Sequence, residues 1–524
     1  MAEPDIIKQI GQLFMVGIKG DSLSVNEEEF LGSNDIGFVI LFSRNFSSPE
    51  NLRKLTYKIH GLGTIPPLIF IDQEGGPILR LGEKGSTVIS HMGIAATGKK
   101  NNARLAGKII GEEMKYLGID GVFAPVLDVN SKADNPVIGI RSFSDNPSVV
   151  SRYASEFYKG LQQSNILGCG KHFPGHGHTA TDSHLEIPES DIDRKFLLAT
   201  NLPPFKKLIN LGIDSLMTAH VKFPVLSEEI STFSPEITYD LLRDELNFDG
   251  VLFSDCMEMS SVKDNYSSEE IIECSFNSSL DVISISHSLS FQKELLNLTK
   301  IKIDSGEISY NRIEKSLCRI NNLKKNIGKK FYNKNINSRP LRKKIKSERK
   351  IANGSITLLK DNIDTLPIPN SSNILILDIK KIGHTANIGQ NSKINLTNGI
   401  AIDYFKNSNY ISWQYKSPIT EKMKKQILKC DHLLIIDHSW SSKTENLKKL
   451  FFKNIFNIRR NAILICANSP YVADIFKYFE TIILTYGFRK VQIEALFRVL
   501  SGKSKPQGKL PVTISSTFPF NSGL

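Results

Sequence analysis

The sequence contains little cysteine and no long hydrophobic run. Its 524 residues include 6 cysteines, which are scattered and form no Cys-x-x-Cys pair. In a chain of this length they are expected to be reduced and mostly buried, because disulfide frameworks are typical of short secreted domains. No stretch of about 18 or more apolar residues occurs, which excludes a membrane-spanning helix.

The start of the chain also lacks the features of a secretion signal. Its first residues, Met-Ala-Glu-Pro-Asp, are acidic and lead into an amphipathic stretch at Ile6–Phe14. A secretion signal would instead have a basic start and an apolar core. Together with reduced cysteines, this predicts a cytoplasmic protein.

Several well-known motifs are missing. There is no Gly-x-Ser-x-Gly turn, which argues against a serine hydrolase, and neither His-Glu-x-x-His nor a cysteine-rich zinc pattern occurs. The net charge of +12 is concentrated around Lys324–Lys350. Because aromatic–basic interleaving and zinc-finger spacing are absent, we expect a solvated basic connector and no nucleic-acid partner.

What the sequence does contain is a regular alternation of short apolar runs and amphipathic stretches. About eight strand–helix units in some 300 residues predict an α/β fold, a parallel (β/α)₈ barrel of the TIM type. An open doubly wound sheet fits less well, because no Gly-x-Gly-x-x-Gly turn follows the first strand. The predicted strands are Leu13–Ile18, Gly37–Phe42, Leu68–Ile71, Gly121–Ala124, Ile166–Gly170, Ser215–Ala219, Gly250–Phe253 and Val282–Ser286, and the predicted helices are Pro49–His60, Ala103–Leu117, Val149–Gln163, Phe196–Leu211, Pro235–Leu246 and Glu269–Ser278.

A second α/β pattern follows the barrel. A long helical region at Phe291–Ile327 is expected to close the first domain, and a smaller sandwich domain is expected to follow a basic linker. The predicted division is 1–328 for the catalytic barrel, 329–350 for the linker and 351–524 for the C-terminal domain. The predicted strands of the second domain are Ser355–Leu359, Asn373–Asp378, His432–Asp437, Ala462–Ala467 and Thr481–Thr485.

Polar residues follow six of the barrel strands directly. In a parallel barrel these strand ends meet on one face, which is where such enzymes place their active sites. Any one of these residues could instead cap a helix, but capping does not explain six such strand ends. The polar residues are Asp72-Gln73-Glu74, Asp128 with Asn130, Lys171-His172, His220, Asp255 and His287.

The densest ionisable stretch is Lys171–His184, with four histidines, one lysine and one aspartate. Its proline and glycines predict a loop. Asp182 and His184 are spaced so that the carboxylate can orient the imidazole as a proton donor and acceptor. Asp255 follows a buried strand and could be a nucleophile, a metal ligand or a structural acceptor, so that a metal-dependent hydrolase using the histidine cluster stays open.

The motifs resemble those of a known family. Lys171–His184 is similar to the Lys-His-Phe-Pro-Gly-His-Gly-(Asp/Asn)-Thr-x-x-Asp-Ser-His stretch of bacterial glycoside hydrolase family 3 β-N-acetylglucosaminidases of the NagZ type. The likeness extends in matching order over nearly all of the first domain, and the second domain resembles the αβα sandwich of the two-domain members. The other matching stretches are Ile71–Gly76 with Arg80, Phe123–Val129, Asn135–Phe143, Met217–His220 and Phe253–Asp255.

The resemblance implies a retaining β-N-acetylhexosaminidase without cofactor or metal. It implies Asp255 as the nucleophile and His184, paired with Asp182, as the acid/base. The substrate would be a muropeptide fragment of peptidoglycan that carries a terminal β-linked N-acetylglucosamine, in a cell-wall recycling role. The implied sugar-binding residues are Asp72, Arg80, Arg141, Lys171 and His172, with His176 and His220 lining or bracing the pocket.

Two positions depart from the family pattern. His178 stands where the family usually has Asp or Asn, and Cys256 stands where Asp or Ala is commoner. A family 3 β-glucosidase is disfavoured, because those enzymes take their acid/base glutamate from elsewhere. Relatives with a histidine acid/base that transfer sugars to phosphate keep an N-acetylglucosaminide phosphorylase open, and a catalytically silent glycan-binding protein is a third alternative.

Overall fold

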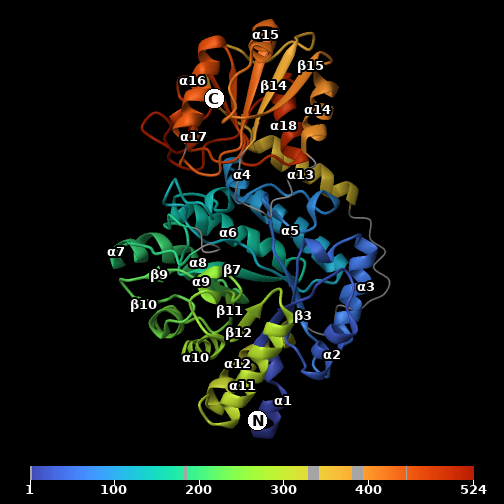
Figure 1. Ribbon diagram of the computed structural model, residues 1–524, viewed down its shortest axis with the longest axis vertical. Coiled ribbons are helices and arrows are strands. Elements are labelled where there is room, and N and C mark those ends of the chain that lie inside the picture. Colours follow the sequence, from blue (N-terminus) through green and yellow to red (C-terminus); the bar gives the residue numbers. More distant parts are fainter. Residues whose placement is uncertain (1–2, 182–185, 328–340, 381–392, 444) are drawn as a thin grey trace.

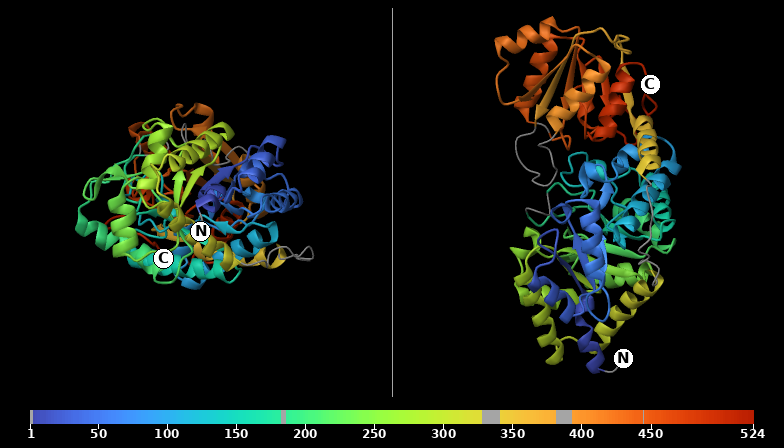
Figure 2. Two further views of the ribbon diagram at one scale, coloured as in Figure 1. Left: turned by 90° about the horizontal axis from the view of Figure 1, so that it is seen from below. Right: turned by 90° about the vertical axis from the view of Figure 1, so that its right-hand side faces the viewer.

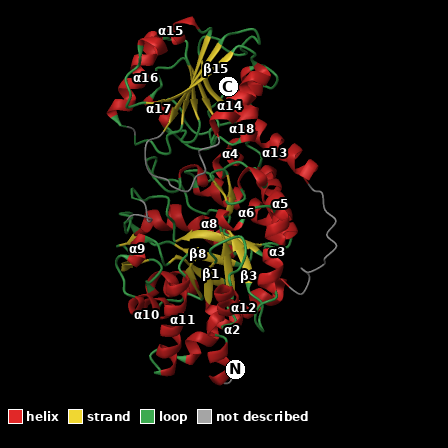
Figure 3. Cartoon of the chain, turned by 45° about the vertical axis from the view of Figure 1, so that its right-hand side comes forward, coloured by secondary structure: helices red, strands yellow, loops and turns green. Residues whose placement is uncertain are grey.

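The computed structural model describes residues 3–181, 186–327, 341–380, 393–443 and 445–524. In its first part, eight parallel strands form a closed barrel in the order β1-β12-β11-β8-β7-β6-β3-β2 (Figure 3). The predicted barrel is thus confirmed, and each of its strands lies at a predicted strand. They are β1 (Phe14–Gly17), β2 (Phe38–Leu41), β3 (Leu68–Ile71), β6 (Gly121–Val122), β7 (Leu167–Phe173), β8 (Ser215–Thr218), β11 (Val251–Cys256) and β12 (Val282–Ile285).

Aromatic side chains fill the barrel interior. The ring of Phe253 lies 5.1 Å from that of Phe38, 5.4 Å from that of Phe70 and 5.7 Å from that of Phe123, measured between centroids. All four rings are buried. This apolar packing closes the interior, as is usual in such barrels. Polar side chains beyond the strand ends therefore lie above a packed floor.

Helices surround the barrel (Figure 1). Helix α3 illustrates how the sequence sets their ends, because the Ser48 hydroxyl accepts a hydrogen bond from the Asn51 N–H and Pro49 occupies the first helical position. The helices and helical turns are α1 (Glu3–Lys8), η1 (Ile10–Leu13), α2 (Val25–Ser33), η2 (Ser43–Asn45), α3 (Pro49–His60), η3 (Gly82–Lys84), α4 (His91–Ala96), α5 (Lys100–Leu117), η4 (Gly139–Arg141), α6 (Pro147–Gln162), α7 (Arg194–Phe196), η5 (Leu197–Asn201), α8 (Leu202–Ile209), η6 (Glu236–Glu245), α9 (Ser260–Lys263), α10 (Ser268–Asn277), α11 (Leu289–Asp304) and α12 (Tyr310–Ile327).

Three sequence predictions need correction. The predicted helix Phe196–Leu211 contains a π-helical turn, η5, before α8, because Pro203 and Pro204 have no N–H for the regular hydrogen-bond ladder. The predicted helical region Phe291–Ile327 is two helices, with Gly306 at a φ of +80° between them. The stretch Lys171–His184 does not begin as a loop, because β7 continues to Phe173.

The second part of the chain folds around one six-stranded sheet in the order β13-β18-β17-β16-β14-β15. Strand β13 is antiparallel to β18, and the other neighbours are parallel. Helices cover both faces, α13, α14 and α18 on one and α15, α16 and α17 on the other (Figure 1). The strands are β13 (Thr357–Asp361), β14 (Ile374–Lys380), β15 (Ser408–Gln414), β16 (His432–Asp437), β17 (Ile463–Cys466) and β18 (Thr481–Leu484), and the helices are α13 (Leu341–Ser355), α14 (Lys393–Tyr404), α15 (Glu421–Lys429), α16 (Asn446–Ile458), α17 (Val472–Ile475) and α18 (Lys490–Leu500).

The αβα sandwich expected for this part is confirmed. Helix α13 covers the end of the stretch predicted as a basic linker, while residues 328–340 lie outside the described part of the chain. The division at 328 and 350 therefore stays a prediction. None of the helices in the described ranges is long and apolar enough to cross a membrane.

The sandwich packs against barrel loops that follow β3 and β6, and the two parts form an elongated molecule (Figure 2). Asn130 donates a hydrogen bond to the Tyr471 hydroxyl at 3.1 Å, and the Arg489 guanidinium donates to the Gly76 carbonyl at 2.9 Å. The six cysteines all lie in described ranges and are free thiols, three of them buried and only Cys318 exposed. This agrees with the expectation of reduced cysteines.

Candidate active site

The barrel mouth holds an ion network around Lys171, at the end of β7. The Lys171 ammonium lies 2.9 Å from Asp72 Oδ1 and 2.7 Å from Glu74 Oε1. Asp72 also accepts a hydrogen bond from Arg80 Nη2 at 2.9 Å. Burial alone would raise the pKa of Asp72, but the adjacent Lys171 and Arg80 outweigh it and hold that pKa far below its usual range. Asp72 is therefore a carboxylate at any physiological pH.

A short hairpin and a helical turn complete this network. Glu74 lies in the hairpin of β4 (Gln73–Gly75) and β5 (Ile78–Leu79), and it accepts two hydrogen bonds from Arg141 in η4, both at 2.9 Å. Burial raises the pKa of Glu74, but Arg141 and Lys171 overcome this and lower the pKa to about 2. The network thus joins the loops that follow β3 and β6 to strand β7.

His172 is oriented by a buried carboxylate. Its Nδ1 donates to Asp128 Oδ2 at 2.7 Å, and its Nε2 lies 3.4 Å from Arg141 Nη2. The other oxygen of Asp128 accepts from the backbone N–H of His176 at 2.7 Å. His176 is neutral, because burial and the neighbouring His172 lower its pKa to about 4. Asp128 therefore fixes both the imidazole of His172 and the start of the following loop.

Asn135 fastens that loop to the one after β6. Its amide donates to the carbonyls of His176 at 2.9 Å and Thr179 at 3.1 Å. Its side-chain oxygen accepts from the backbone N–H groups of Val137 and Ile138. One buried amide thereby connects the loop that carries Arg141 with the loop that leads towards residue 182.

Asp255 lies near the C-terminal end of β11, and its carboxylate is partly exposed. Its Oδ1 accepts a hydrogen bond from the Cys256 N–H at 2.7 Å. His220, which follows β8, donates from Nε2 to the Cys256 carbonyl at 3.1 Å, while its Nδ1 lies 2.8 Å from the Thr232 hydroxyl. His220 thus braces the strand end that carries Asp255.

A chain of ring contacts connects the two sides of the mouth. The Arg80 guanidinium lies 5.3 Å from the ring centroid of Phe42, and the Phe42 ring lies 5.3 Å from that of His287. A ring nitrogen of His287 lies within 4.8 Å of the Cys256 sulfur. Arg80, which binds Asp72, is therefore connected through this series of contacts to Cys256, which follows Asp255.

The predicted acid/base pair, Asp182 and His184, lies outside the described residues, so its assignment stays a prediction. Among the described histidines of the stretch, each has its own protein partner: His172 has Asp128, His176 has Thr179 and His178 has Ser131. These contacts give no support to the alternative in which this cluster binds a metal. They brace the loop instead.

Sequence reasoning missed several residues of the site. Glu74 and Asp128 were noticed as polar strand ends but were given no role, and Asn135 was noticed only within the family resemblance. Thr179, which holds His176, was likewise noticed only within the family motif, and Thr232, which holds His220, carried no signal at all. For Glu74 a usable signal existed, because it lies two residues from Asp72 after the same strand.

A closed parallel barrel whose strand ends carry paired carboxylates and cations is the architecture of a barrel enzyme that acts on a polar substrate. Residues 6–323 match the glycosyl hydrolase family 3 N-terminal domain, and the chain therefore belongs to glycoside hydrolase family 3.

Known relatives agree with this assignment. The chain is 38% identical over 254 residues to a β-hexosaminidase of Alkalilimnicola ehrlichii, and the aligned region covers 47% of this chain and 72% of that protein. It is 36% identical over 250 residues to a β-hexosaminidase of Idiomarina loihiensis, covering 47% and 74%. A family 3 β-N-acetylglucosaminidase from Paenibacillus sp. str. FPU-7 superimposes with a TM-score of 0.88 at 28% identity, covering 97% of this chain and 98% of that one. The resemblance to family 3 β-N-acetylhexosaminidases, and with it the prediction of a glycoside hydrolase, is confirmed.

Proposed function

We propose that this chain is a retaining, exo-acting β-N-acetylhexosaminidase that removes terminal β-linked N-acetylglucosamine from peptidoglycan fragments in the cytoplasm. The observation that carries the proposal is the ion network of Asp72, Glu74, Arg80, Arg141 and Lys171 in a family 3 barrel whose β11 carries Asp255 near its C-terminal end. The similarity to β-hexosaminidases supports the N-acetyl sugar, and the recycling role rests on the sequence resemblance.

In the proposed mechanism, Asp255 attacks the anomeric carbon while His184 protonates the leaving oxygen. The glycosidic bond breaks as the bond from the sugar to the Asp255 carboxylate forms. Water, deprotonated by His184, then displaces the carboxylate and releases the sugar with its configuration retained. Asp182 would orient the imidazole for both proton transfers.

The ion network would hold the sugar ring at the non-reducing end. The Asp72 carboxylate can accept hydrogen bonds from sugar hydroxyls, while the guanidinium groups of Arg80 and Arg141 and the Lys171 ammonium can donate to them. Because these groups are already paired and mostly buried, they would meet the substrate with little reorganisation. His172, held by Asp128, would add a directed imidazole edge.

The test is hydrolysis of an aryl β-N-acetylglucosaminide beside the matching β-glucoside, by the wild type and by Asp255→Ala and His184→Ala. Asp255→Ala should lose nearly all turnover. His184→Ala should slow a poor leaving group by about 10²–10⁴-fold and an activated aryl group much less, because only the former needs the proton. The exposed Asp264→Ala is the matched control and should keep full activity.

Full turnover by Asp255→Ala would refute the nucleophile assignment, and equal losses on both leaving groups would refute the acid role of His184. Addition of inorganic phosphate distinguishes a phosphorylase from a hydrolase. Formation of N-acetylglucosamine 1-phosphate in place of the free sugar would replace hydrolysis by phosphorolysis. Loss of turnover on treatment with a chelator would revive the metal-dependent alternative.

A further inference from the structure

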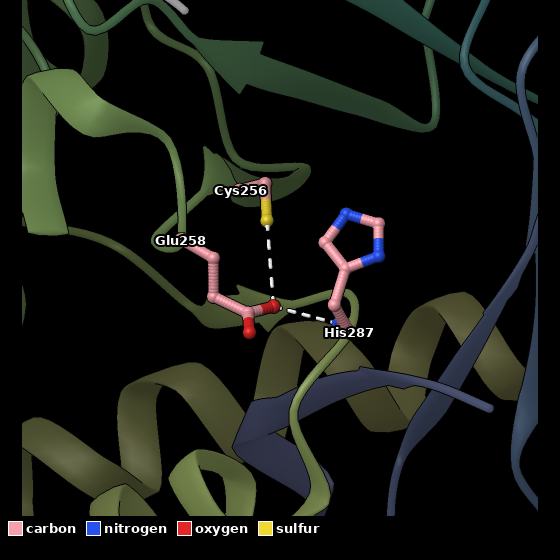
Figure 4. Close-up of side chains that lie close together, drawn as sticks. All are labelled: Cys256, Glu258 and His287. Carbon is pink, nitrogen blue, oxygen red and sulfur yellow. Dashed lines mark hydrogen bonds between the residues drawn. The ribbon is translucent and has the colours of Figure 1, made fainter. Parts of the chain in front are cut away.

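Three potential metal ligands meet beside Asp255. Cys256 is the last residue of β11, Glu258 follows two residues later, and His287 follows the neighbouring strand β12. One ligand atom from each side chain lies within 4.8 Å of the other two. Figure 4 shows the thiol and the carboxylate directed toward each other, with the imidazole ring beside them. In the described part of the chain, no other group of three potential ligands approaches this closely.

We propose that Cys256, Glu258 and His287 bind a divalent metal ion of the zinc class, and that the bound metal inhibits the enzyme. A thiolate, an imidazole and a carboxylate are the ligands that Zn²⁺ takes in proteins, usually in a tetrahedral arrangement. Ligand atoms of such a site lie about 3.5 Å apart. The Cys256 sulfur already lies 3.9 Å from Glu258 Oε2, and the ligand atoms of all three side chains lie within 4.8 Å of one another, so only a small approach is needed. As the metal–sulfur bond forms, the Cys256 thiol releases its proton to water, and solvent water supplies the fourth ligand.

The backbone already holds one ligand in place. Glu258 Oε2 accepts a hydrogen bond from the His287 N–H at 2.6 Å, and Oε1 accepts one from the Ser288 N–H at 2.9 Å. Oε1 keeps a further lone pair for a metal, and Oε2 gains one when the Cys256 thiol, which donates to it at 3.9 Å, loses its proton. Because these bonds tie the segment after β11 to the segment after β12, the carboxylate stays near both other ligands.

Arg44 competes with the metal for His287. Its Nη1 lies 3.1 Å from His287 Nδ1, and the imidazole has to give up this hydrogen bond to become a ligand. Arg44 does not lose its place, because it also donates to the carbonyls of Ile18 and Ser286. Together with Arg80, Arg44 puts positive charge near the site, so we expect a reversible metal site rather than a permanently occupied one.

The link to catalysis passes through the Cys256 backbone. Its N–H donates to Asp255 Oδ1 and its carbonyl accepts from His220. Drawing the Cys256 sulfur toward a metal moves the strand end that carries Asp255. The inhibitory consequence rests on the proposed role of Asp255, whereas metal binding itself does not.

The binding test is titration of the full chain with Co²⁺, a spectroscopic substitute for Zn²⁺ whose thiolate complexes absorb in the near ultraviolet. The wild type should develop this absorption with one equivalent of Co²⁺ and lose it on addition of Zn²⁺. Cys256→Ser should abolish the band. His287→Gln and Glu258→Gln should weaken binding at least about tenfold, since even loss of a supporting residue costs 10–100-fold. The exposed Cys318→Ser is the control and should keep the band.

Absence of the band in the wild type, or its survival in Cys256→Ser, would overturn the site. Because Cys256→Ser could also disturb the fold, the two other variants give an independent measure, and unchanged affinity in both would equally overturn it.

The inhibition test measures hydrolysis of the aryl β-N-acetylglucosaminide with increasing Zn²⁺, each variant relative to its own metal-free rate. Wild-type activity should fall over the range in which the Co²⁺ site fills, and His287→Gln should need at least about tenfold more Zn²⁺. Unchanged turnover with a filled site would overturn the inhibitory role. If the metal-free wild type shows no turnover of this substrate, it is the proposed function that fails, and the cobalt spectrum still decides the site.

Discussion

At the scale of single residues, Glu74 shows what the sequence could and could not reveal. Its place after β3, two residues beyond Asp72, marks it as a polar group at the barrel mouth. Its partner Arg141 lies 67 positions further along the chain. No local pattern pairs two residues so distant, because the pairing exists only once the barrel brings β3 and β6 together. The residue types at the mouth were predictable, whereas their pairing was not.

We predict that Glu74→Gln lowers the free energy of unfolding by about 3–5 kcal/mol at pH 7, because Arg141 then loses its buried countercharge and Lys171 keeps only Asp72. The pKa of Glu74 is lowered from 4.5 to about 2 in the folded protein. Its charged form therefore stabilises the fold above pH 4.5, and this contribution is lost as the pH falls toward 2. The difference in the free energy of unfolding between wild type and variant should therefore become smaller as the pH falls.

Urea unfolding at pH 7 and at about pH 3 measures this gap. The partly exposed Glu112→Gln on α5 is the matched control and should unfold like the wild type at both values, since exposed ion pairs contribute little. Equal stability of Glu74→Gln and wild type at pH 7, or a gap that widens on acidification, would contradict the prediction.

At the scale of elements, the sequence predicted the long-period features and missed the local ones. Strand β3 and helix α3 have the predicted limits, Leu68–Ile71 and Pro49–His60. The hairpin β4–β5 was not predicted, because strands this short leave no periodic signal. Strand β15 was missed for another reason. It is an edge strand whose side chains are mostly polar and half-exposed. Because the strand is not buried, its sequence contains no apolar run that would predict it.

We predict that Asn135→Ala lowers kcat more than it raises KM. Asn135 holds the carbonyls of His176 and Thr179, and the loop that these residues form leads directly to the proposed acid/base pair. Its loss should loosen the proposed proton donor more than the ion network proposed to hold the sugar. The expected drop in the free energy of unfolding is about 1–3 kcal/mol, the cost of leaving buried polar groups unpaired.

Steady-state kinetics with a poor and an activated leaving group measure this effect. Asn135→Asp keeps the oxygen that accepts from Val137 and Ile138 and loses the donors, so it should show the same kcat defect. The exposed Asn101→Asp is the control. Wild-type kcat in Asn135→Asp would mean that the bonds to the second loop do not position the acid.

At the scale of the whole molecule, the sequence predicted two folded parts but not how they are joined. Contacts between the parts use side chains whose roles are invisible in sequence, such as Tyr471 against Asn130 and Ser144 against the Pro511 carbonyl. Such contacts involve single polar residues on loops, without period or motif. Both contacts lie on the loop after β6 that carries Arg141, and Arg489 contacts Gly76 in the loop after β3 that carries Glu74, so the second domain supports the side of the mouth proposed to bind the sugar.

Arg489 provides the test of that support. Its guanidinium donates to the carbonyls of Gly76 and Pro77 at 2.9 and 3.2 Å, directly beside the hairpin β4–β5. We predict that Arg489→Met raises KM several-fold with little change in kcat, because the hairpin carries Glu74 of the network proposed to bind the sugar and none of the proposed reacting groups. The interface should weaken by about 1.5–3 kcal/mol, the range for hydrogen bonds to a charged group. Steady-state kinetics measure the change in KM, and thermal unfolding measures the loss of stability. Arg459→Met, which removes an arginine bonded only within the second domain to the Asp431 carbonyl, is the matched control. An unchanged KM in Arg489→Met, or an equal rise in Arg459→Met, would show that the second domain does not position the hairpin.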